Sequence, residues 1–366
     1  MKKWMKPAGI TTASVLAVSM LAAGCGKQDN QTAGSAAAPA PAAGGSNQAA
    51  ATKPSGPPQK VKIMVGGLEK IIYLPAKLTE SLGYFKDEGL DVELTSEAAG
   101  QNAEEALVAG QIDATVGFYD HTIDLQSKGK FLESVVQFEG VPGETLVVSN
   151  KLKDSVKTLA DLKGKNIGVT GLGSSTNFLA NYLVTKGGNT SKDYVPLAVG
   201  SGNTLIAAMQ QGKVDLAVTT EPTVSMLKAK GIASTFVDML SIEGTKQALG
   251  GTYPAACLYM RNDYVKGHPD ITQKLANAFV KTLQYINTHS AEEIADKMPK
   301  EYYAGDKDMY VTALKASLPS FTKDGKMPAD GPAKVLDVLT TFNPKLKDAK
   351  IDLSQTYTTQ FVDKVK

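Results

Sequence analysis

The stretch GQIDATVGFYDHT at residues 110–122 occurs a second time as GKVDLAVTTEPT at residues 212–223, an offset of 102 positions (212 minus 110). The match extends upstream at the same offset, where Gly100 pairs with Gly202. In each copy a helix-like segment ends at a glycine and an apolar, β-type run follows. A repeated unit of this kind predicts that the chain builds the same element twice, once in each of two lobes.

β-type runs alternate with helix-like segments through most of the chain. The runs are residues 60–66, 90–96, 112–118, 134–139, 165–171, 194–200 and 214–220. Strand, helix and strand in this rhythm are typical of parallel sheets covered by helices. The sequence therefore predicts an α/β fold of two wound lobes.

An aspartate enters the strand in each copy of the repeat, as Asp113 and Asp215. Such an aspartate is most simply a turn residue. The loops that follow the strands are more informative, because wound sheets bind ligands at the carboxyl ends of their strands. Those loops are residues 66–73, 98–102 and 117–122 in the first lobe and 171–176, 200–204 and 219–223 in the second. Two facing sets of loops predict a ligand cleft between the lobes.

The loop GLGSST at residues 171–176 partly matches the dinucleotide-binding fingerprint. Thr176 stands where the third glycine belongs, so a nicotinamide site is weakly supported. What remains is a glycine-rich turn before a helix N-terminus, which suits an anionic or carbonyl group. Ordinary helix capping without a ligand explains the same residues.

The N-terminus has the pattern of an export signal. Lys2, Lys3 and Lys6 precede an apolar run at residues 8–23, which is shorter than a typical membrane-spanning helix. The following LAAGC resembles a bacterial lipobox, so we expect residues 1–24 to be removed and Cys25 to carry a lipid. A plain signal peptide that contains a cysteine is the alternative.

Residues 25–59 are rich in Ala, Pro, Gly and Ser and have almost nothing apolar to bury, which predicts a flexible tether. Loss of the three signal lysines reduces 39 basic residues to 36, against 37 acidic ones. This balance gives no electrostatic case for binding nucleic acid. The remaining body is long enough that a single core is expected to split.

Cysteine and histidine are scarce. With Cys25 lipidated, Cys257 has no disulfide partner, and its apolar surroundings predict a buried core residue. The histidines stand at positions 121, 268 and 289, without the spacing of metal ligands. We therefore expect neither a metal site nor a cofactor.

Four phrases, at residues 74–94, 106–117, 158–169 and 207–218, resemble the substrate-binding proteins of bacterial ATP-binding-cassette (ABC) importers. The resemblance is to the type II periplasmic-binding-protein group for nitrate, sulfonate, taurine and thiamine precursors, and it covers residues 60–288. It implies an α/β fold with two lobes joined by two crossing segments.

By this resemblance the first lobe is residues 60–148, the second is 149–255, and residues 256–366 complete the first. The crossings are expected near residues 144–150 and 252–260. Apolar residues at helical spacing predict a long amphipathic helix that packs on the first lobe. They are Ile271, Leu275, Phe279, Leu283 and Ile286.

The resemblance also implies the residues of the cleft, of which we expect about half to touch the solute. They are Leu68, Tyr73, Gln101, Asn102, Phe118, Tyr119, Asp120, His121, Gly173, Ser174, Ser175, Thr176, Asn203, Glu221 and Tyr253. The sole arginine, Arg261, lies outside these loops, so a bidentate grip on a sulfonate is not expected there. Lys70 is available as a point charge. The acidic and aromatic loops favour a planar or partly cationic solute, or an aromatic acid, and vitamin precursors, small aromatics and organosulfur compounds all stay open.

The leading hypothesis is a binding protein, not an enzyme, that delivers a small solute to an ABC permease and its ATPase. We expect a monomer, anchored to the bilayer through Cys25 on the extracytoplasmic face of a Gram-positive membrane. One alternative is an enzyme with His121 as base, against which adjacent Asp120 and His121 are expected to point in different directions. Pyrimidine synthases of the family also carry a cysteine-rich motif, which this chain lacks. A ligand-sensing lipoprotein is the other alternative.

Overall fold

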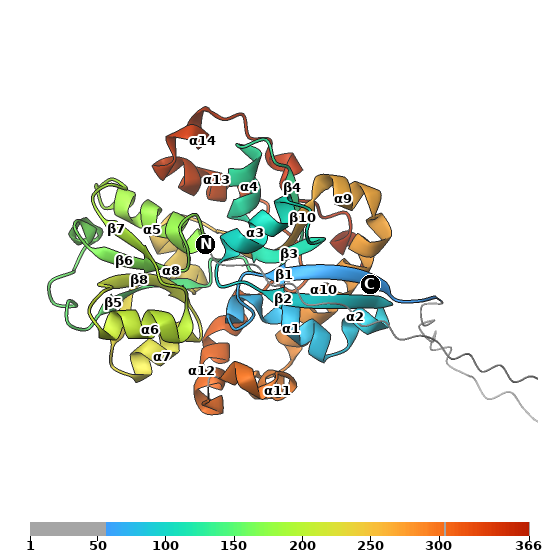
Figure 1. Ribbon diagram of the computed structural model, residues 1–366, viewed down its shortest axis with the longest axis horizontal. Coiled ribbons are helices and arrows are strands. Elements are labelled where there is room, and N and C mark those ends of the chain that lie inside the picture. Colours follow the sequence, from blue (N-terminus) through green and yellow to red (C-terminus); the bar gives the residue numbers. More distant parts are fainter. Residues whose placement is uncertain (1–55, 304, 366) are drawn as a thin grey trace, which may run out of the picture. The chain divides into compact units, whose positions relative to one another are not determined.

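The computed structural model describes residues 56–303 and 305–365, which belong to one compact unit of the chain, Thr52–Lys366. The expected export signal, the expected lipid on Cys25 and the tether as far as residue 55 lie outside the described residues. The body contains two five-stranded sheets with helices around them (Figure 1).

The first sheet has the strand order β2-β1-β3-β10-β4 and the second has the order β7-β6-β8-β5-β9. The strands of the first are β1 (Gln59–Val65), β2 (Leu90–Ser96), β3 (Ala114–Phe118), β4 (Leu132–Gln137) and β10 (Ala256–Arg261). Those of the second are β5 (Glu144–Ser149), β6 (Asn166–Val169), β7 (Val195–Ala198), β8 (Leu216–Thr220) and β9 (Ala233–Met239). Each predicted β-type run forms a strand, and the α/β fold of two wound lobes is confirmed.

The two sheets share one topology, which explains the repeat in the sequence. In each sheet the second strand, β1 in the first and β6 in the second, has a parallel neighbour on both sides. The repeated aspartates have the same role: Asp113 Oδ2 accepts the backbone N–H of Lys62 at 2.8 Å, and Asp215 Oδ2 accepts that of Asn166 at 2.9 Å. Both carboxylates therefore tie the start of one strand to its neighbour, as structural residues.

Both sheets are mixed rather than purely parallel, which corrects the expected crossings. β5 runs antiparallel to β8 and β9, and β10 runs antiparallel to β3 and β4. The segment expected to form the first crossing is thus β5 of the second sheet, so the second lobe begins near Glu144 and not at residue 149. The chain passes between the sheets at residues 138–143 and 250–255, where Ala255 N–H donates to Glu139 O and Tyr253 N–H donates to Gly140 O.

The helices pack on both sheets (Figure 1). They are α1 (Leu74–Ser81), α2 (Tyr84–Asp87), α3 (Gly100–Val108), α4 (Asp120–Gln126), α5 (Ser175–Lys186), α6 (Gly202–Gln210), α7 (Thr223–Ala229), α8 (Ile242–Leu249), α9 (Asn262–Gly267), α10 (Pro269–Thr288), α11 (Ala291–Lys297), α12 (Lys307–Ser317), α13 (Gly331–Phe342) and α14 (Pro344–Asp348). The predicted amphipathic helix is α10, which begins with a proline, buries its expected apolar stripe and packs on α1, α2 and β4. Cys257 is fully buried in β10, as expected.

The C-terminal helices contact both lobes. α13 packs against α4 of the first lobe and α5 of the second, and Figure 1 shows it beside both. Phe342 of α13 stacks at a tilt on Phe178 of α5, with ring centroids 5.9 Å apart. α12 contacts α7 of the second lobe and the short 3₁₀ turn η1 (Ile71–Tyr73) of the first. The C-terminal segment therefore braces the lobes in addition to completing the first one.

Among the described helices, none combines the length and the apolar character that spanning a bilayer requires.

The duplicated aspartate contact predicts matched effects in the two lobes. We expect Asp113→Ala and Asp215→Ala each to lower the free energy of unfolding by about 1–2 kcal/mol, because each removes a charge-assisted hydrogen bond. Urea denaturation measures the loss. Asp→Asn at either site keeps an acceptor oxygen, so its free energy of unfolding is expected to fall by less. A loss of stability in only one of the two Asp→Ala variants would contradict the shared role.

Candidate functional site

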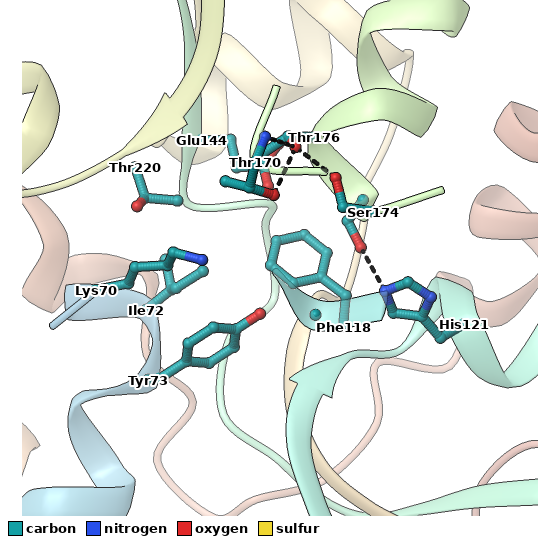
Figure 2. Close-up of a pocket in the computed structure, with 12 residues that line it drawn as sticks. Lys70, Ile72, Tyr73, Phe118, His121, Glu144, Thr170, Ser174, Thr176 and Thr220 are labelled. Atoms are coloured by element: carbon teal, nitrogen blue, oxygen red, sulfur yellow. Dashed lines mark hydrogen bonds between the residues drawn. The ribbon is translucent and has the colours of Figure 1, made fainter. Parts of the chain in front are cut away.

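A small cavity lies at the carboxyl ends of the strands, where the two lobes meet (Figure 2). Residues of both lobes line it: Lys70, Ile72, Tyr73, Gly100, Phe118 and His121 from the first, and Glu144, Thr170, Ser174, Ser175, Thr176 and Thr220 from the second. Its volume is about 10 Å³, about the space that one water molecule needs. A solute of several heavy atoms therefore requires the lobes to move apart before it enters.

The first lobe contributes a base and two aromatic rings to the cavity. The Tyr73 and Phe118 rings meet edge to face with centroids 6.4 Å apart. Lys70 is buried, and its Nζ donates to the carbonyl oxygens of Gly66 and Ala98. Burial lowers the pKa of Lys70, although the carboxylates of Glu69 and Glu144 oppose that shift. The Lys70 ammonium therefore has backbone partners already in this state.

The second lobe contributes the N-terminus of α5. Ser174 is the N-cap, and its hydroxyl accepts the N–H of Asn177. The Thr176 hydroxyl accepts the Thr170 N–H at 2.9 Å, which fixes the loop against the end of β6. The sequence-predicted glycine-rich turn therefore forms a capped helix start at the cavity, with its hydroxyls turned toward neighbouring loop atoms.

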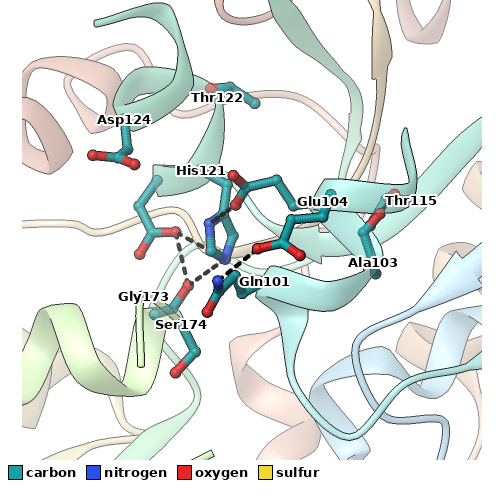
Figure 3. Close-up of polar contacts among 12 residues, drawn as sticks. Gln101, Ala103, Glu104, Thr115, His121, Thr122, Asp124, Gly173 and Ser174 are labelled. Carbon is teal, nitrogen blue, oxygen red and sulfur yellow. Dashed lines mark hydrogen bonds and ion pairs between the residues drawn. The ribbon is translucent and has the colours of Figure 1, made fainter. Parts of the chain in front are cut away.

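A buried polar cluster joins the lobes at one wall of the cavity (Figure 3). The Ser175 hydroxyl of α5 donates to Asp120 Oδ1 at 2.7 Å and lies 3.3 Å from His121 Nε2. The other ring nitrogen of His121 forms an ion pair with the Glu104 carboxylate. Tyr253, from the second crossing, donates its hydroxyl to Asp120 Oδ2 at 3.0 Å. Adjacent Asp120 and His121 thus converge on one hydroxyl, which corrects the expectation that they point in different directions.

The charges of this cluster are coupled. Burial alone lowers the pKa of His121, but the carboxylates of Glu104 and then Asp120 overcome that effect and raise the pKa to about 9. Burial raises the pKa of Asp120, while His121, Ser175 and Tyr253 pull it back down. At neutral pH the imidazole is therefore a buried cation held between two carboxyl groups.

Two further polar residues, absent from the predicted set, line the cavity. Glu144 begins β5 and is the register partner of Thr220, which ends β8 at the cavity. Glu144 Oε2 and Thr220 Oγ1 are buried and have no hydrogen-bond partner among the described residues. The acidic residue at the start of the apolar run ETLVVS was the available signal, but it was interpreted as part of a crossing.

The predicted cleft residues divide into three groups. Tyr73, Phe118, His121, Ser174, Ser175 and Thr176 line the cavity. Asp120 and Tyr253 lie directly behind it, through the contacts with Ser175. The others do not line it: Leu68, Gln101, Asn102, Tyr119, Gly173, Asn203 and Glu221.

The residues outside the cavity have identifiable roles. The Tyr119 hydroxyl bonds to Thr356 Oγ1 inside the first lobe. Gln101 and Asn102 bond to carboxylates of their own lobe, and Gly173 lies against Gln101. Asn203 is exposed on α6, and Leu68 donates its N–H to the hydroxyl of Ser96, the last residue of β2. The Glu221 carboxylate accepts the Ser225 N–H at the start of α7. Lys70, Ile72, Gly100 and Thr170 are further lining residues that the predicted set omits.

Close contacts hold the lobes together around the cavity. Ile71 N–H donates to Glu221 O across the lobes at 3.0 Å, and Ser201 Oγ donates to Glu69 at 2.9 Å. Gly171 faces Ala99 so closely that a Cβ added at Gly171 would lie 2.9 Å from the Ala99 Cβ. The described structure is therefore the closed arrangement of the two lobes.

In the part of the chain that the structure describes, no group of three or more His, Cys, Asp or Glu side chains is arranged to hold a metal ion.

Residues 73–293 match the NMT1/THI5-like family, and the chain belongs to this family. Among its relatives is the Bacillus subtilis protein YtlA, named as a binding protein, which is 24% identical over 248 residues, 67% of this chain and 71% of YtlA. Another is the 4-amino-5-hydroxymethyl-2-methylpyrimidine phosphate synthase of Aspergillus parasiticus, 26% identical over 301 residues, 79% of this chain and 83% of that enzyme. The family thus includes proteins named for binding and proteins named for catalysis.

Solved structures share the fold. A protein of Bordetella bronchiseptica is 37% identical, with a TM-score of 0.79 over 83% of this chain and 96% of its own. The alkanesulfonate-binding protein SsuA of Xanthomonas axonopodis, solved with MOPS, is 19% identical, with a TM-score of 0.64 over 83% of this chain and all of its own. The fold is therefore that of the type II periplasmic binding proteins, as the sequence resemblance implied.

The raised pKa of His121 predicts a pH-dependent contribution to stability. Because the folded pKa, about 9, exceeds the ordinary value of 6.5, this contribution is complete below pH 6.5 and is lost as the pH rises through 9. Its size is on the order of 3 kcal/mol. We expect the free-energy difference between wild type and His121→Gln to shrink over this range in urea denaturation. A difference that stays constant from pH 6 to pH 9.5 would show that folding does not raise the pKa of the imidazole.

The contact of Gly171 with Ala99 predicts a variant that opposes closure. Gly171→Ala places two backbone-borne methyl groups too close, a strain of about 1–3 kcal/mol, which the lobes relieve by separating. The Ile71 amide, bonded to the other lobe, is then expected to exchange hydrogen at least about tenfold faster by NMR.

Ala99→Gly combined with Gly171→Ala removes the opposing methyl group and is the matched control. Protection of the Ile71 amide is expected to return in this double variant. Unchanged exchange in Gly171→Ala alone would mean that the lobes are not held at this distance in solution.

Proposed function

We propose that this protein captures a small organic solute between its two lobes and delivers it to a membrane permease of an ABC importer. The observation that carries the proposal is the cavity itself, which is lined from both lobes and contains buried polar atoms, Glu144 Oε2 and Thr220 Oγ1, without partners among the described residues. Buried polar groups are costly unless they are hydrogen-bonded. A solute that supplies the missing partners is favoured at this place.

Opening and closing follow from the same geometry. Two crossings, residues 138–143 and 250–255, join the lobes side by side, so a change in their backbone angles moves one lobe relative to the other. In addition to the packing of α12 and α13 on the second lobe, hydrogen bonds and van der Waals contacts join the lobes around the cavity. A bound solute adds contacts to both lobes and therefore shifts the population toward the closed form.

The proposal includes the location of the protein at the membrane. The export-type N-terminus, the lipid expected on Cys25 and the tether expected before β1 would keep the binding body close to an extracytoplasmic membrane surface. A monomer on a tether of this kind can reach its permease without leaving the membrane. The family resemblance, which includes nitrate, sulfonate, taurine and thiamine precursors, supplies the candidate solute classes.

An enzyme is the second candidate, and one observation favours it. The Ser175 hydroxyl, the His121 imidazole and the Glu104 carboxylate lie in series in a buried site, an arrangement that can move a proton. Relatives named as pyrimidine phosphate synthases belong to the same family. Against catalysis, the Ser175 proton is donated to Asp120 rather than to His121, and the cluster joins the two lobes.

A thermal-unfolding screen of residues 52–366 tests solute capture. The panel contains pyrimidines, sulfonates, nitrate, taurine, aromatic acids and amines. A solute at a hundred times its dissociation constant adds about 2.7 kcal/mol to stability, which is expected to raise the unfolding midpoint by about 5 °C. One chemical class that shifts the midpoint supports the proposal, and a panel without any shift speaks against it.

His121→Gln separates capture from catalysis. For a binding protein we expect mass spectrometry to recover the stabilising solute unchanged after incubation with the wild type. The variant is expected to lose at most about a factor of ten in affinity for this solute, because at most one hydrogen bond to the solute is lost. A product that forms with the wild type and not with His121→Gln would establish the enzyme instead.

A further inference from the structure

The residues in and behind the cavity carry more acidic than basic groups. Three carboxyl groups, those of Glu104, Asp120 and Glu144, lie there with two bases, Lys70 and His121. His121 is already paired with Glu104 and lies beside Asp120, and Lys70 donates to backbone carbonyls. The third carboxyl group is that of Glu144, a residue with 1% of its surface exposed.

Glu144 is positioned to receive a donor from the cavity. It begins β5 opposite Thr220, at the edge where both residues line the cavity, and Figure 2 shows Thr220 and Lys70 on one side of the site. Glu144 Oε2 has no hydrogen-bond partner in residues 56–303 and 305–365. In the ionised form both oxygens of the Glu144 carboxylate only accept hydrogen bonds, so the partner that this form lacks is an N–H or O–H donor.

The single arginine of the chain does not correct this imbalance. Arg261 is the last residue of β10, next to Met260, which pairs with Ala114 at the amino end of β3. The cavity lies at the opposite end of that strand, beside Phe118. Arg261 donates to the Leu107 carbonyl instead. An anionic solute would therefore add a further negative charge to an acidic site without a guanidinium to receive it.

We propose that Glu144 is the specificity-determining residue of the cavity and that the captured solute presents a cationic nitrogen, such as an ammonium or amidinium group, to its carboxylate. This inference rests on the proposed function and names its solute class. The Thr220 hydroxyl, also without a partner in the described part of the chain, provides a second polar contact for the same group. The capped start of α5 is left for an acceptor atom elsewhere on the solute.

Binding of such a solute is linked to protons. Burial raises the pKa of Glu144 well above its usual range, an effect that Asp120 and Glu139 increase and Lys70 opposes. The ionisable groups coupled to Glu144 are Lys70, Tyr73, Asp120, Glu139 and Tyr253. A cation placed beside the carboxylate favours its ionised form. Binding then releases a proton, and affinity rises with pH.

Matched probe pairs test the solute class. They are benzylamine with benzyl alcohol, benzamidine with benzamide, and taurine with isethionate, next to benzoate, ethanesulfonate and nitrate as anions. In thermal unfolding of the wild type we expect a cationic member to raise the midpoint and its neutral or anionic counterpart not to. Titration calorimetry in two buffers of different ionisation enthalpy is expected to report proton release for that probe.

Glu144→Gln is the test variant and Glu133→Gln is its control. Glu133 is also a buried carboxyl residue whose pKa is raised by burial, but it lies in β4, does not line the cavity and is not among the groups coupled to Glu144. We expect Glu144→Gln to weaken binding of the cationic probe at least tenfold and to abolish the proton release. Glu133→Gln is expected to change the affinity less than threefold.

The outcomes separate this inference from the proposed function. Stabilisation by anions alone, or unchanged or tighter binding by Glu144→Gln, overturns the solute class while solute capture stands. Proton uptake instead of release by the wild type also overturns it, and this needs no variant. A panel in which no probe of either charge shifts the midpoint overturns the solute class and counts against solute capture as well.

Discussion

The contact between the two lobes depends on the requirement that buried polar groups have hydrogen-bond or ion-pair partners. Ser175 of the second lobe satisfies Asp120 and approaches His121 of the first, and Glu104 balances the imidazole from behind. Glu144 and Thr220 line the same cavity, and their Oε2 and Oγ1 atoms are buried without hydrogen-bond partners among the described residues. The site therefore contains two kinds of polar group. The hydrogen-bonded and ion-paired groups join the lobes, and the groups without partners favour binding of a solute.

The duplicated fold provides this arrangement. The same end of the corresponding strand in each sheet lines the cavity, Phe118 at the end of β3 and Thr220 at the end of β8. The crossings run side by side, and α12 and α13 of the C-terminal segment contact both lobes. Closure thus involves helices distant in sequence from the cavity. The buried imidazole, the acidic cavity and the contact of Gly171 with Ala99 all describe one closed state.

Much of the fold could be predicted from the sequence, and the site only in part. The repeat and the β-type runs indicated the lobes, and the strand ends indicated Tyr73, Phe118 and the start of α5. Tyr119 was wrongly expected in the cavity, because successive side chains leave a strand end in opposite directions. Glu144 was missed because it meets Thr220 through an antiparallel pairing between segments far apart in the chain, which local periodicity does not encode.

The most direct test of the account is the distance between one spin label on each lobe, measured by pulsed electron paramagnetic resonance. The measurement is made with and without the solute that stabilises the protein. We predict a broad distribution that includes longer distances without solute, and a narrow distribution at shorter distances, in which the lobes close only as far as the solute between them allows, when the solute is bound. An identical distribution in both conditions would contradict capture by closure of the lobes.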